Sequence, residues 1–211
     1  MTQARLVGRI GEGSLVLDAG AGSGGATKIL LSLGCEVVSL DFAIEGARKL
    51  KTSVPDAHAI IGDVRCLPFK ENTFDSEVLW GTLEYSGLIE RTFAEAHRVV
   101  RNGLIFTGWN DLGPISFLAR IPYRGRKPQL FSVHDIGGIL STYGFEIKEI
   151  EGLFFILPSQ LRILRGISKR LKLPVDKLAM ITARINRRIT KSKLGTHVCP
   201  VVEFFAQRMT D

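Results

Sequence analysis

Short apolar segments alternate with amphipathic ones along the first 150 residues of the chain. Short runs rich in β-branched and aromatic side chains are typical of buried strands, and apolar residues spaced three and four apart predict helices. Alternation of the two with short connections is typical of a parallel sheet that helices cover on both faces, so the sequence predicts an α/β, doubly wound fold. The expected strands are residues 14–19, 36–40, 58–61, 74–80, 104–109, 145–150 and 198–207, and the expected helices are 26–33, 43–51, 88–100 and 133–143.

Glycine and polar residues stand where these predicted strands end. A glycine loop at residues 20–25 (GAGSGG) follows the first strand, Asp41 follows the second, Asp63 comes after the third, and Trp80 ends the fourth. Ligands of open α/β sheets bind outside the carboxyl ends of the parallel strands. We therefore expect one ligand site at this edge of the sheet.

The composition fits a single domain over residues 1–211. The length is sufficient for one sizeable core, and no apolar stretch reaches the ~18–20 residues that a membrane span needs. The first residues do not resemble a secretory leader, so we expect a cytoplasmic protein. The three cysteines lie far apart, and neither they nor the four histidines have the spacing of metal ligands, so we expect no metal site.

The positive charge is concentrated in one segment. The chain has a formal net charge of +7, and residues 159–193 hold eleven Lys and Arg against the single acid Asp176. We interpret this segment as a basic helical insertion between the last two strands. Three roles remain open: packing on the domain, peripheral contact with an anionic membrane, and binding of nucleic acid, which is less favoured because the segment has no aromatic residue for base stacking. A second segment, residues 111–131, is rich in Gly and Pro and is predicted to be a loop, either a lid over the site or a surface excursion.

The glycine loop allows two interpretations. Gly20, Gly22 and Gly25 match the dinucleotide fingerprint, with Asp41 about twenty residues further on. Asp18 distinguishes the two, because dinucleotide folds usually place an apolar residue there. A carboxylate at this point suits a ligand that carries a free ammonium group.

The motifs taken together resemble those of class I S-adenosylmethionine-dependent methyltransferases over about residues 14–150. The segments 16–27 (VLDAGAGSGGAT), 40–42 (LDF), 62–64 (GDV), 67–69 (LPF), 74–81 and 95–101 carry the resemblance. It implies a Rossmann-like sheet of about seven strands, mostly parallel with the last antiparallel. It also implies that Asp41 binds the ribose hydroxyls and Asp63 the adenine amino group. The expected cofactor-binding residues are Asp18, Ala19, Gly20, Gly22, Gly24, Asp41, Phe42, Asp63, Val64 and Trp80.

The acceptor is less well defined by these motifs. Tyr85 and Trp109 are expected to line a substrate pocket, and Trp80 fits core packing equally well. Glu84, Tyr85 and His134 are the candidates for a general base, although transfer from a sulfonium needs one only if the acceptor holds its proton. The leading hypothesis is methyl transfer to a small-molecule or lipid-like acceptor by in-line displacement. The alternatives are an RNA or protein methyltransferase, a non-catalytic adenosylmethionine-binding protein and, less favoured, a nicotinamide oxidoreductase.

Overall fold

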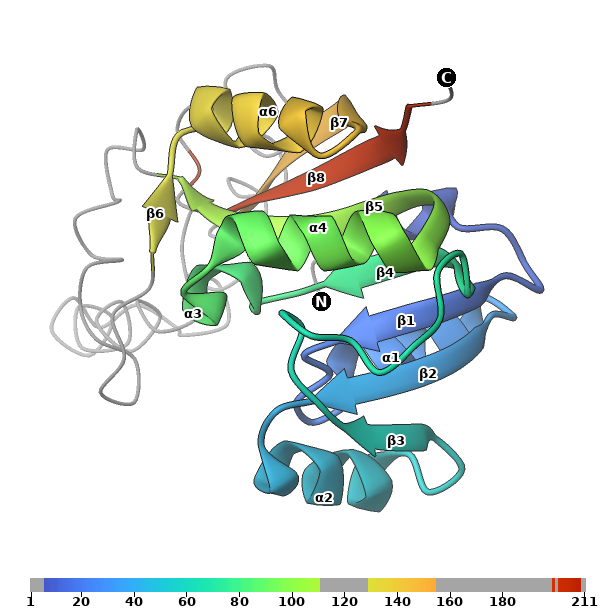
Figure 1. Ribbon diagram of the computed structural model, residues 1–211. Coiled ribbons are helices and arrows are strands. Elements are labelled where there is room, and N and C mark those ends of the chain that lie inside the picture. Colours follow the sequence, from blue (N-terminus) through green and yellow to red (C-terminus); the bar gives the residue numbers. More distant parts are fainter. Residues whose placement is uncertain (1–5, 111–128, 155–198, 200, 210–211) are drawn as a thin grey trace, which may run out of the picture.

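A computed structural model of the chain describes residues 6–110, 129–154, 199 and 201–209 (Figure 1). Within them a single sheet has the strand order β3-β2-β1-β4-β5-β8-β7, and a short strand, β6, pairs with the end of β5. The strands are β1 (Leu15–Ala19), β2 (Glu36–Asp41), β3 (His58–Ile61), β4 (Phe74–Leu79), β5 (Val100–Asn110), β6 (Leu130–Phe131), β7 (Phe145–Phe154) and β8 (Val201–Arg208). The helices are the 3-10 helix η1 (Leu6–Arg9) and the α-helices α1 (Gly25–Ser32), α2 (Ile44–Ser53), α3 (Leu83–Ser86), α4 (Ile89–Val99) and α6 (Val133–Thr142).

The sheet confirms the predicted fold class. The five central strands β3, β2, β1, β4 and β5 are mutually parallel, and β8 runs antiparallel to both β5 and β7. The parallel order reverses beside β1, which leads to β2 on one side and lies next to β4 on the other. This is the switch point where α/β sheets bind ligands.

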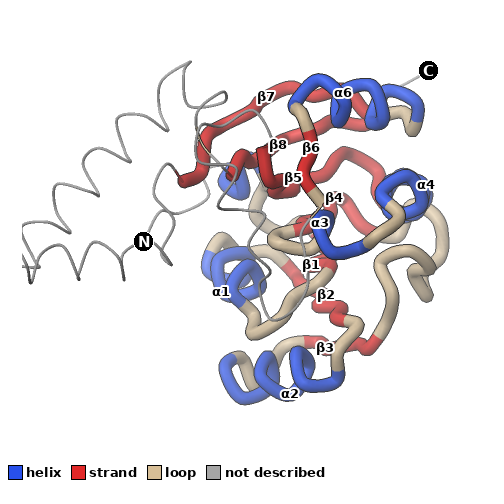
Figure 2. The backbone as a smooth tube through the Cα atoms, turned by 90° about the vertical axis from the view of Figure 1, so that its left-hand side faces the viewer, coloured by secondary structure: helices blue, strands red, loops and turns tan. Residues whose placement is uncertain are grey.

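Helices pack on both faces of the sheet (Figure 2). On one face α4 and α6 cover a core whose centre is a set of aromatic rings: Phe93 of α4 meets Phe106 edge-on at 5.5 Å, and Phe106 stacks on Phe204 at 4.6 Å. On the other face η1 and α1 pack over Val16, Val78 and neighbouring side chains. Successive strand residues point to opposite faces of the sheet. Since helices cover both faces, the central strands carry apolar side chains on both of them.

Local sequence explains the helix boundaries. α4 buries Ile89, Phe93, Ala96 and Val99, whose spacing of three and four residues places them on one face. α6 begins at Ser132, whose side-chain oxygen accepts a hydrogen bond from the Asp135 backbone N–H at 3.0 Å. α4 packs on β5, and α6 packs on β7.

Several boundaries correct the sequence-based expectations. The fourth strand ends at Leu79, so Trp80 stands after it, and η1 and α3 were not expected. The predicted loop 111–131 is wrong at its end, because residues 130–131 form β6 beside Trp109 and Asn110. A pair of residues is too short for any periodic pattern, and its backbone pairing with β5 decides its structure. The rest of that loop and the basic segment 159–193 lie outside the described residues.

A buried acid in β4 departs from the apolar pattern of the central strands. Glu77 in the middle of β4 is fully buried, and neither carboxyl oxygen has a hydrogen-bond partner. Burial, and next the charge of Glu95, raise the pKa of Glu77 to about 8. Within the described chain no helix has the length and apolar character to span a bilayer.

We expect Glu77→Val to stabilise the protein. A buried polar group without a partner costs about 1–3 kcal/mol, and valine suits a central strand. Because the folded-state pKa is raised, the neutral acid is tolerated below its unfolded pKa of 4.5, and stability is lost as the pH rises toward 8. The gain of the variant over wild type should therefore be larger at pH 8 than at pH 5. Urea unfolding at both pH values measures it.

The matched control is Glu36→Val, the same change at an exposed position of β2. Surface substitutions of this kind change stability by less than about 0.5 kcal/mol, with no such pH dependence. Equal effects of the two substitutions at both pH values would contradict the assignment of a destabilising acid at position 77.

Candidate functional site

A pocket of about 780 Å³ lies at the carboxyl ends of the parallel strands. The loops after β1, β2, β3 and β4 all contribute to it, so the structure has a pocket at the sheet edge where we expect the ligand site. Its lining residues are Gly20, Ala21, Gly22, Asp41, Phe42, Ala43, Asp63, Val64, Arg65, Trp80, Gly81, Thr82, Tyr85 and Ser86.

The glycine loop folds back on the end of β2. The backbone N–H groups of Gly20 and Ala21 both donate to the Leu40 carbonyl, at 2.7 and 3.0 Å. Gly20, Gly22 and Gly24 have positive φ angles, which glycine adopts without strain. The loop thereby presents its backbone to the pocket.

The three glycines are required for different reasons. A Cβ on Gly20 would lie 2.0 Å from the Thr82 hydroxyl, and one on Gly24 would lie 2.6 Å from Leu50 of α2. A Cβ on Gly22 would have no protein atom closer than 4.0 Å. Gly20 and Gly24 therefore serve packing, whereas the space beside Gly22 is open to a ligand.

Asp41 connects the loop to α2. Its Oδ2 accepts the Gly22 N–H at 2.7 Å and its Oδ1 accepts the Ala43 N–H at 2.8 Å. Gly46 lies so close that a Cβ there would be 2.7 Å from the Asp41 carboxyl carbon. A carboxylate oxygen accepts about two hydrogen bonds, so each oxygen keeps capacity for a ligand hydroxyl.

Asp18 and Ala19 lie beneath the pocket, not among its lining residues. Asp18 is 1% exposed, and its Oδ2 accepts a hydrogen bond from the Thr27 hydroxyl at 2.5 Å. The Thr27 hydroxyl also contacts the Ser39 hydroxyl at 3.0 Å. Burial raises the pKa of Asp18 to about 6, although the Thr27 hydrogen bonds lower it. The hydrogen bond of Asp18 thus joins β1 to the first turn of α1. Gly24 also lies outside the lining, because it packs against Leu50 of α2.

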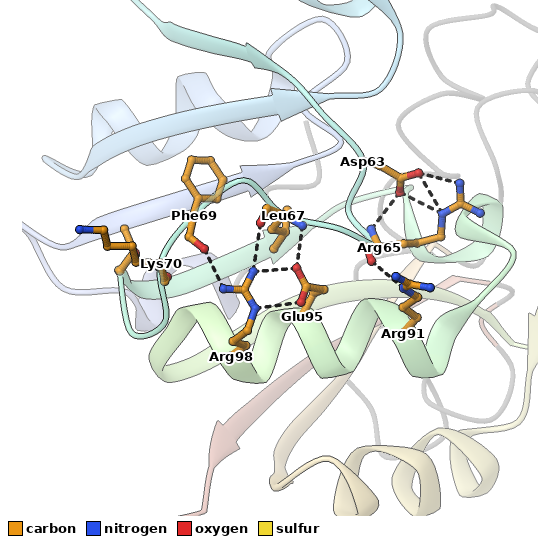
Figure 3. Close-up of polar contacts among 9 residues, drawn as sticks. Asp63, Arg65, Leu67, Phe69, Lys70, Arg91, Glu95 and Arg98 are labelled. Carbon is orange, nitrogen blue, oxygen red and sulfur yellow. Dashed lines mark hydrogen bonds and ion pairs between the residues drawn. The ribbon is translucent and has the colours of Figure 1, made fainter.

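Asp63 lies in the pocket beside a residue that the sequence reasoning did not identify. The Arg65 guanidinium pairs with the Asp63 carboxylate, with Nη2 to Oδ2 at 2.6 Å and Nε to Oδ1 at 2.9 Å (Figure 3). This hydrogen bonding lowers the pKa of Asp63 more than partial burial raises it. In the sequence, the only indication of this ion pair is that Arg65 stands two positions after Asp63.

The segment after β4 forms another part of the lining. The Gly81 N–H donates to the Thr107 hydroxyl at 2.8 Å, and the Thr82 hydroxyl donates to the Ala19 carbonyl at 3.1 Å. These bonds join β4 to β5 and β1. They hold α3, which contributes Tyr85 and Ser86.

Trp80 combines both of its predicted roles. It lines the pocket, and it also packs against the cluster around η1 and α1. Its Nε1 donates to Glu203 Oε1 at 2.9 Å, and Glu203 Oε2 accepts the Leu6 N–H at 3.3 Å. Burial raises the pKa of Glu203 to about 7. The sequence reasoning missed Glu203, because an acid in an otherwise apolar strand gives no positional signal.

The remaining predicted residues are distributed more widely. Phe42 and Val64 line the pocket with Asp41 and Asp63. Glu84 is buried, and the His134 side chain on α6 is almost fully exposed and outside the lining. The side chain of Trp109 lies outside the described residues.

Comparison with known proteins identifies the domain. Residues 17–107 match the family model described as a methyltransferase domain. A demethylmenaquinone methyltransferase from Renibacterium salmoninarum is 34% identical over 91 residues, which cover 43% of this chain and 38% of the relative. A sterol 24-C-methyltransferase from Saccharomyces cerevisiae is 33% identical over 161 residues, covering 68% of this chain and 42% of the relative. The chain thus spans less than half the length of these two relatives.

Solved structures agree on the fold. Magnesium protoporphyrin IX methyltransferase from Synechocystis, solved with bound SAH, superimposes with a TM-score of 0.64 at 16% identity, covering 97% of this chain and 79% of that one. The [4+2]-cyclase SpnF gives a TM-score of 0.66 at 18% identity, covering 98% and 80%. At such identities these likenesses concern the fold alone. Residues 17–107 therefore match a methyltransferase domain, and the sheet order and the strand-end motifs of this chain agree with that match.

Proposed function

We propose that this protein transfers the methyl group of S-adenosylmethionine to a small, lipid-like acceptor by in-line displacement. The observation that carries the proposal is the set of side chains that line the pocket described above. It combines an open glycine backbone and two carboxylates with the hydroxyl and aromatic residues Thr82, Tyr85 and Ser86. The methyl-bearing end of S-adenosylmethionine and the methyl acceptor can thus occupy the same cavity.

The residues present fit the adenosyl part of the cofactor. Gly22 leaves open space where any side chain would stand, and its neighbour in the pocket, Asp41, has acceptor capacity for two hydroxyls. Asp63 has acceptor capacity for an amino group. Phe42, which is 68% exposed, offers an apolar surface for a purine ring.

The chemistry needs alignment more than acid–base assistance. S-adenosylmethionine supplies a methyl group on a positively charged sulfur, which leaves as a neutral thioether when the acceptor attacks the methyl carbon. The protein's residues hold the two reactants in line and exclude water. Thr82 and Gly81 are suited to this, because their hydrogen bonds to Ala19 and Thr107 fix the backbone that faces the pocket.

A small, lipid-like acceptor is supported by the relatives and by the lining. The relatives that match this chain are named for demethylmenaquinone, a sterol and malonyl-[acyl-carrier protein]. The aromatic residues Trp80 and Tyr85 line the pocket, and the hydrogen bond to Glu203 holds the Trp80 indole in place. Tyr85 is the one of the three base candidates that belongs to the lining among the described residues, so we assign it to the acceptor side.

We expect Gly22→Ala to weaken binding of S-adenosylhomocysteine at least tenfold. The added methyl group would occupy the open space that the ligand needs. It would not clash with the protein, because no protein atom lies closer than 4.0 Å to it. Isothermal titration calorimetry measures the change, and circular dichroism monitors the fold.

Gly13→Ala is the matched control for this substitution. Gly13 has a φ of +77°, and a Cβ there would meet nothing within 4 Å. It carries comparable backbone strain, about 1–2 kcal/mol, but lies in a turn outside the pocket. Binding that falls equally in both variants would show that strain, not the pocket, is responsible.

The acceptor class is tested by radiolabelled methyl transfer to separate lipid, RNA and protein fractions. We expect the label in the organic-extractable lipid fraction with wild type and Gly13→Ala, and several-fold less with Gly22→Ala at a subsaturating cofactor concentration. Label in RNA or protein would contradict a lipid-like acceptor. Tight binding of S-adenosylhomocysteine without transfer to any fraction would favour a non-catalytic binding protein.

A further inference from the structure

Arg65 is the one cation in the described lining of the pocket, and its side chain is directed at Asp63 (Figure 3). Three N–H groups of Arg65 serve the carboxylate. The backbone N–H and Nε reach Oδ1 at 2.9 Å each, and Nη2 reaches Oδ2 at 2.6 Å. Nε is shared, since it also lies 3.1 Å from Oδ2. Oδ2 accepts one unshared hydrogen bond, from Nη2, and the weaker half of the shared Nε bond, so it is the oxygen that keeps capacity for a ligand donor.

The loop that carries this pair is held independently of the Arg65 side chain. Glu95 of α4 accepts the Leu67 N–H at 2.6 Å. Arg98 donates to the carbonyls of Leu67 and Phe69 at 3.0 and 2.7 Å (Figure 3). The Glu95–Arg98 ion pair thus clamps residues 67–69 to α4.

A second anchor lies directly at Arg65. The Arg91 Nε donates to the Arg65 backbone carbonyl at 3.1 Å. The hydrogen bonds of the Arg65 guanidinium described above, by contrast, go to the Asp63 carboxylate. Removing that guanidinium therefore changes the carboxylate while the backbone anchors stay in place.

The paired carboxylate has defined recognition properties. A fork of N–H donors holds the carboxylate in one orientation and keeps it ionised. The remaining site accepts a hydrogen bond and cannot donate one. An exocyclic amino group matches it, whereas a carbonyl oxygen in the same place would face the carboxylate with lone pairs on both sides. The fixed orientation also prevents the carboxylate from turning toward a ring N–H beside that carbonyl.

We propose that Arg65 is a positioning residue that makes Asp63 selective for a 6-aminopurine over a 6-oxopurine. This inference rests on the proposed binding of the adenosyl group in this pocket. The Arg65 side chain is thereby given a role in discriminating between the two kinds of purine. Holding the loop in place is the task of Arg91, Glu95 and Arg98 of α4. Arg65 acts on the ligand through Asp63.

The test compares two ligands by calorimetry: S-adenosylhomocysteine and its inosine analogue, in which a carbonyl replaces the 6-amino group. Arg65→Ala should weaken the adenosyl ligand about tenfold and leave the inosine analogue within about twofold, because an unheld Asp63 carboxylate can turn away from the 6-amino group, a contact that only the adenosyl ligand makes. Arg65→Lys, which keeps the charge but not the fork, should fall between wild type and Arg65→Ala. Arg48→Ala removes an exposed arginine paired with Glu45 on α2 and should not change the ratio.

The pH dependence gives a second readout that loss of packing alone would not change. Arg65 lowers the pKa of Asp63, so wild-type binding should hold as the pH falls toward the ordinary carboxyl range. In Arg65→Ala the pKa of Asp63 returns upward, and binding of the adenosyl ligand should decline at a higher pH than in wild type. If Arg65→Ala proves unfolded, Arg65→Lys carries the same comparison.

An unchanged ratio of the two affinities in folded Arg65→Ala would overturn the inference. Tighter binding of S-adenosylhomocysteine by that variant would also overturn it, because Arg65 would then compete with the ligand for Asp63. Failure of the wild-type protein to bind S-adenosylhomocysteine is a different outcome, since it would contradict the proposed function itself.

Discussion

The site depends on how the chain turns at the end of β1. Two successive N–H groups of the glycine loop converge on the Leu40 carbonyl, and a third, from Gly22, reaches the Asp41 carboxylate. A backbone can make this turn only with positive φ angles, so glycine is required at its corners. The same turn brings the loop under Thr82 and against Leu50. The ends of three strands and the start of α2 are thereby held in one arrangement.

This dependence explains how much of the site the sequence could predict. Gly22, Asp41 and Asp63 were found because a strand end followed by a glycine or an acid is a local pattern with a topological meaning. Arg65 was not, because its importance comes from a side-chain orientation. Asp18 is buried, and it accepts a hydrogen bond from the Thr27 hydroxyl that no local pattern in the sequence predicts; its expected contact with the ligand stays a prediction.

The fold was predictable for a similar reason and to a similar extent. Apolar runs located the long strands, because both faces of a central strand are buried and the signal is repeated in each residue. Short elements escaped: α3 spans four residues and β6 two, and each is stabilised by contacts with distant parts of the chain, such as the Gln129 N–H that donates to the Glu84 carbonyl. Acids within strands, Glu77 and Glu203, were missed because burial by neighbouring elements is not visible along the sequence.

The position of β8 has a consequence for how such a protein can diversify. β8 lies between β5 and β7, and Val201 is the register partner of both Trp109 and Phe154. Phe154 and Val201 therefore lie at directly neighbouring points of the sheet, at the same edge as the strand ends that form the site. The entropy of closing a loop grows only slowly with its length, so segments of very different size can be exchanged between these two points while the strand pairing is preserved. The sheet and the adenosyl side can remain constant through evolution while the neighbouring sequence is replaced.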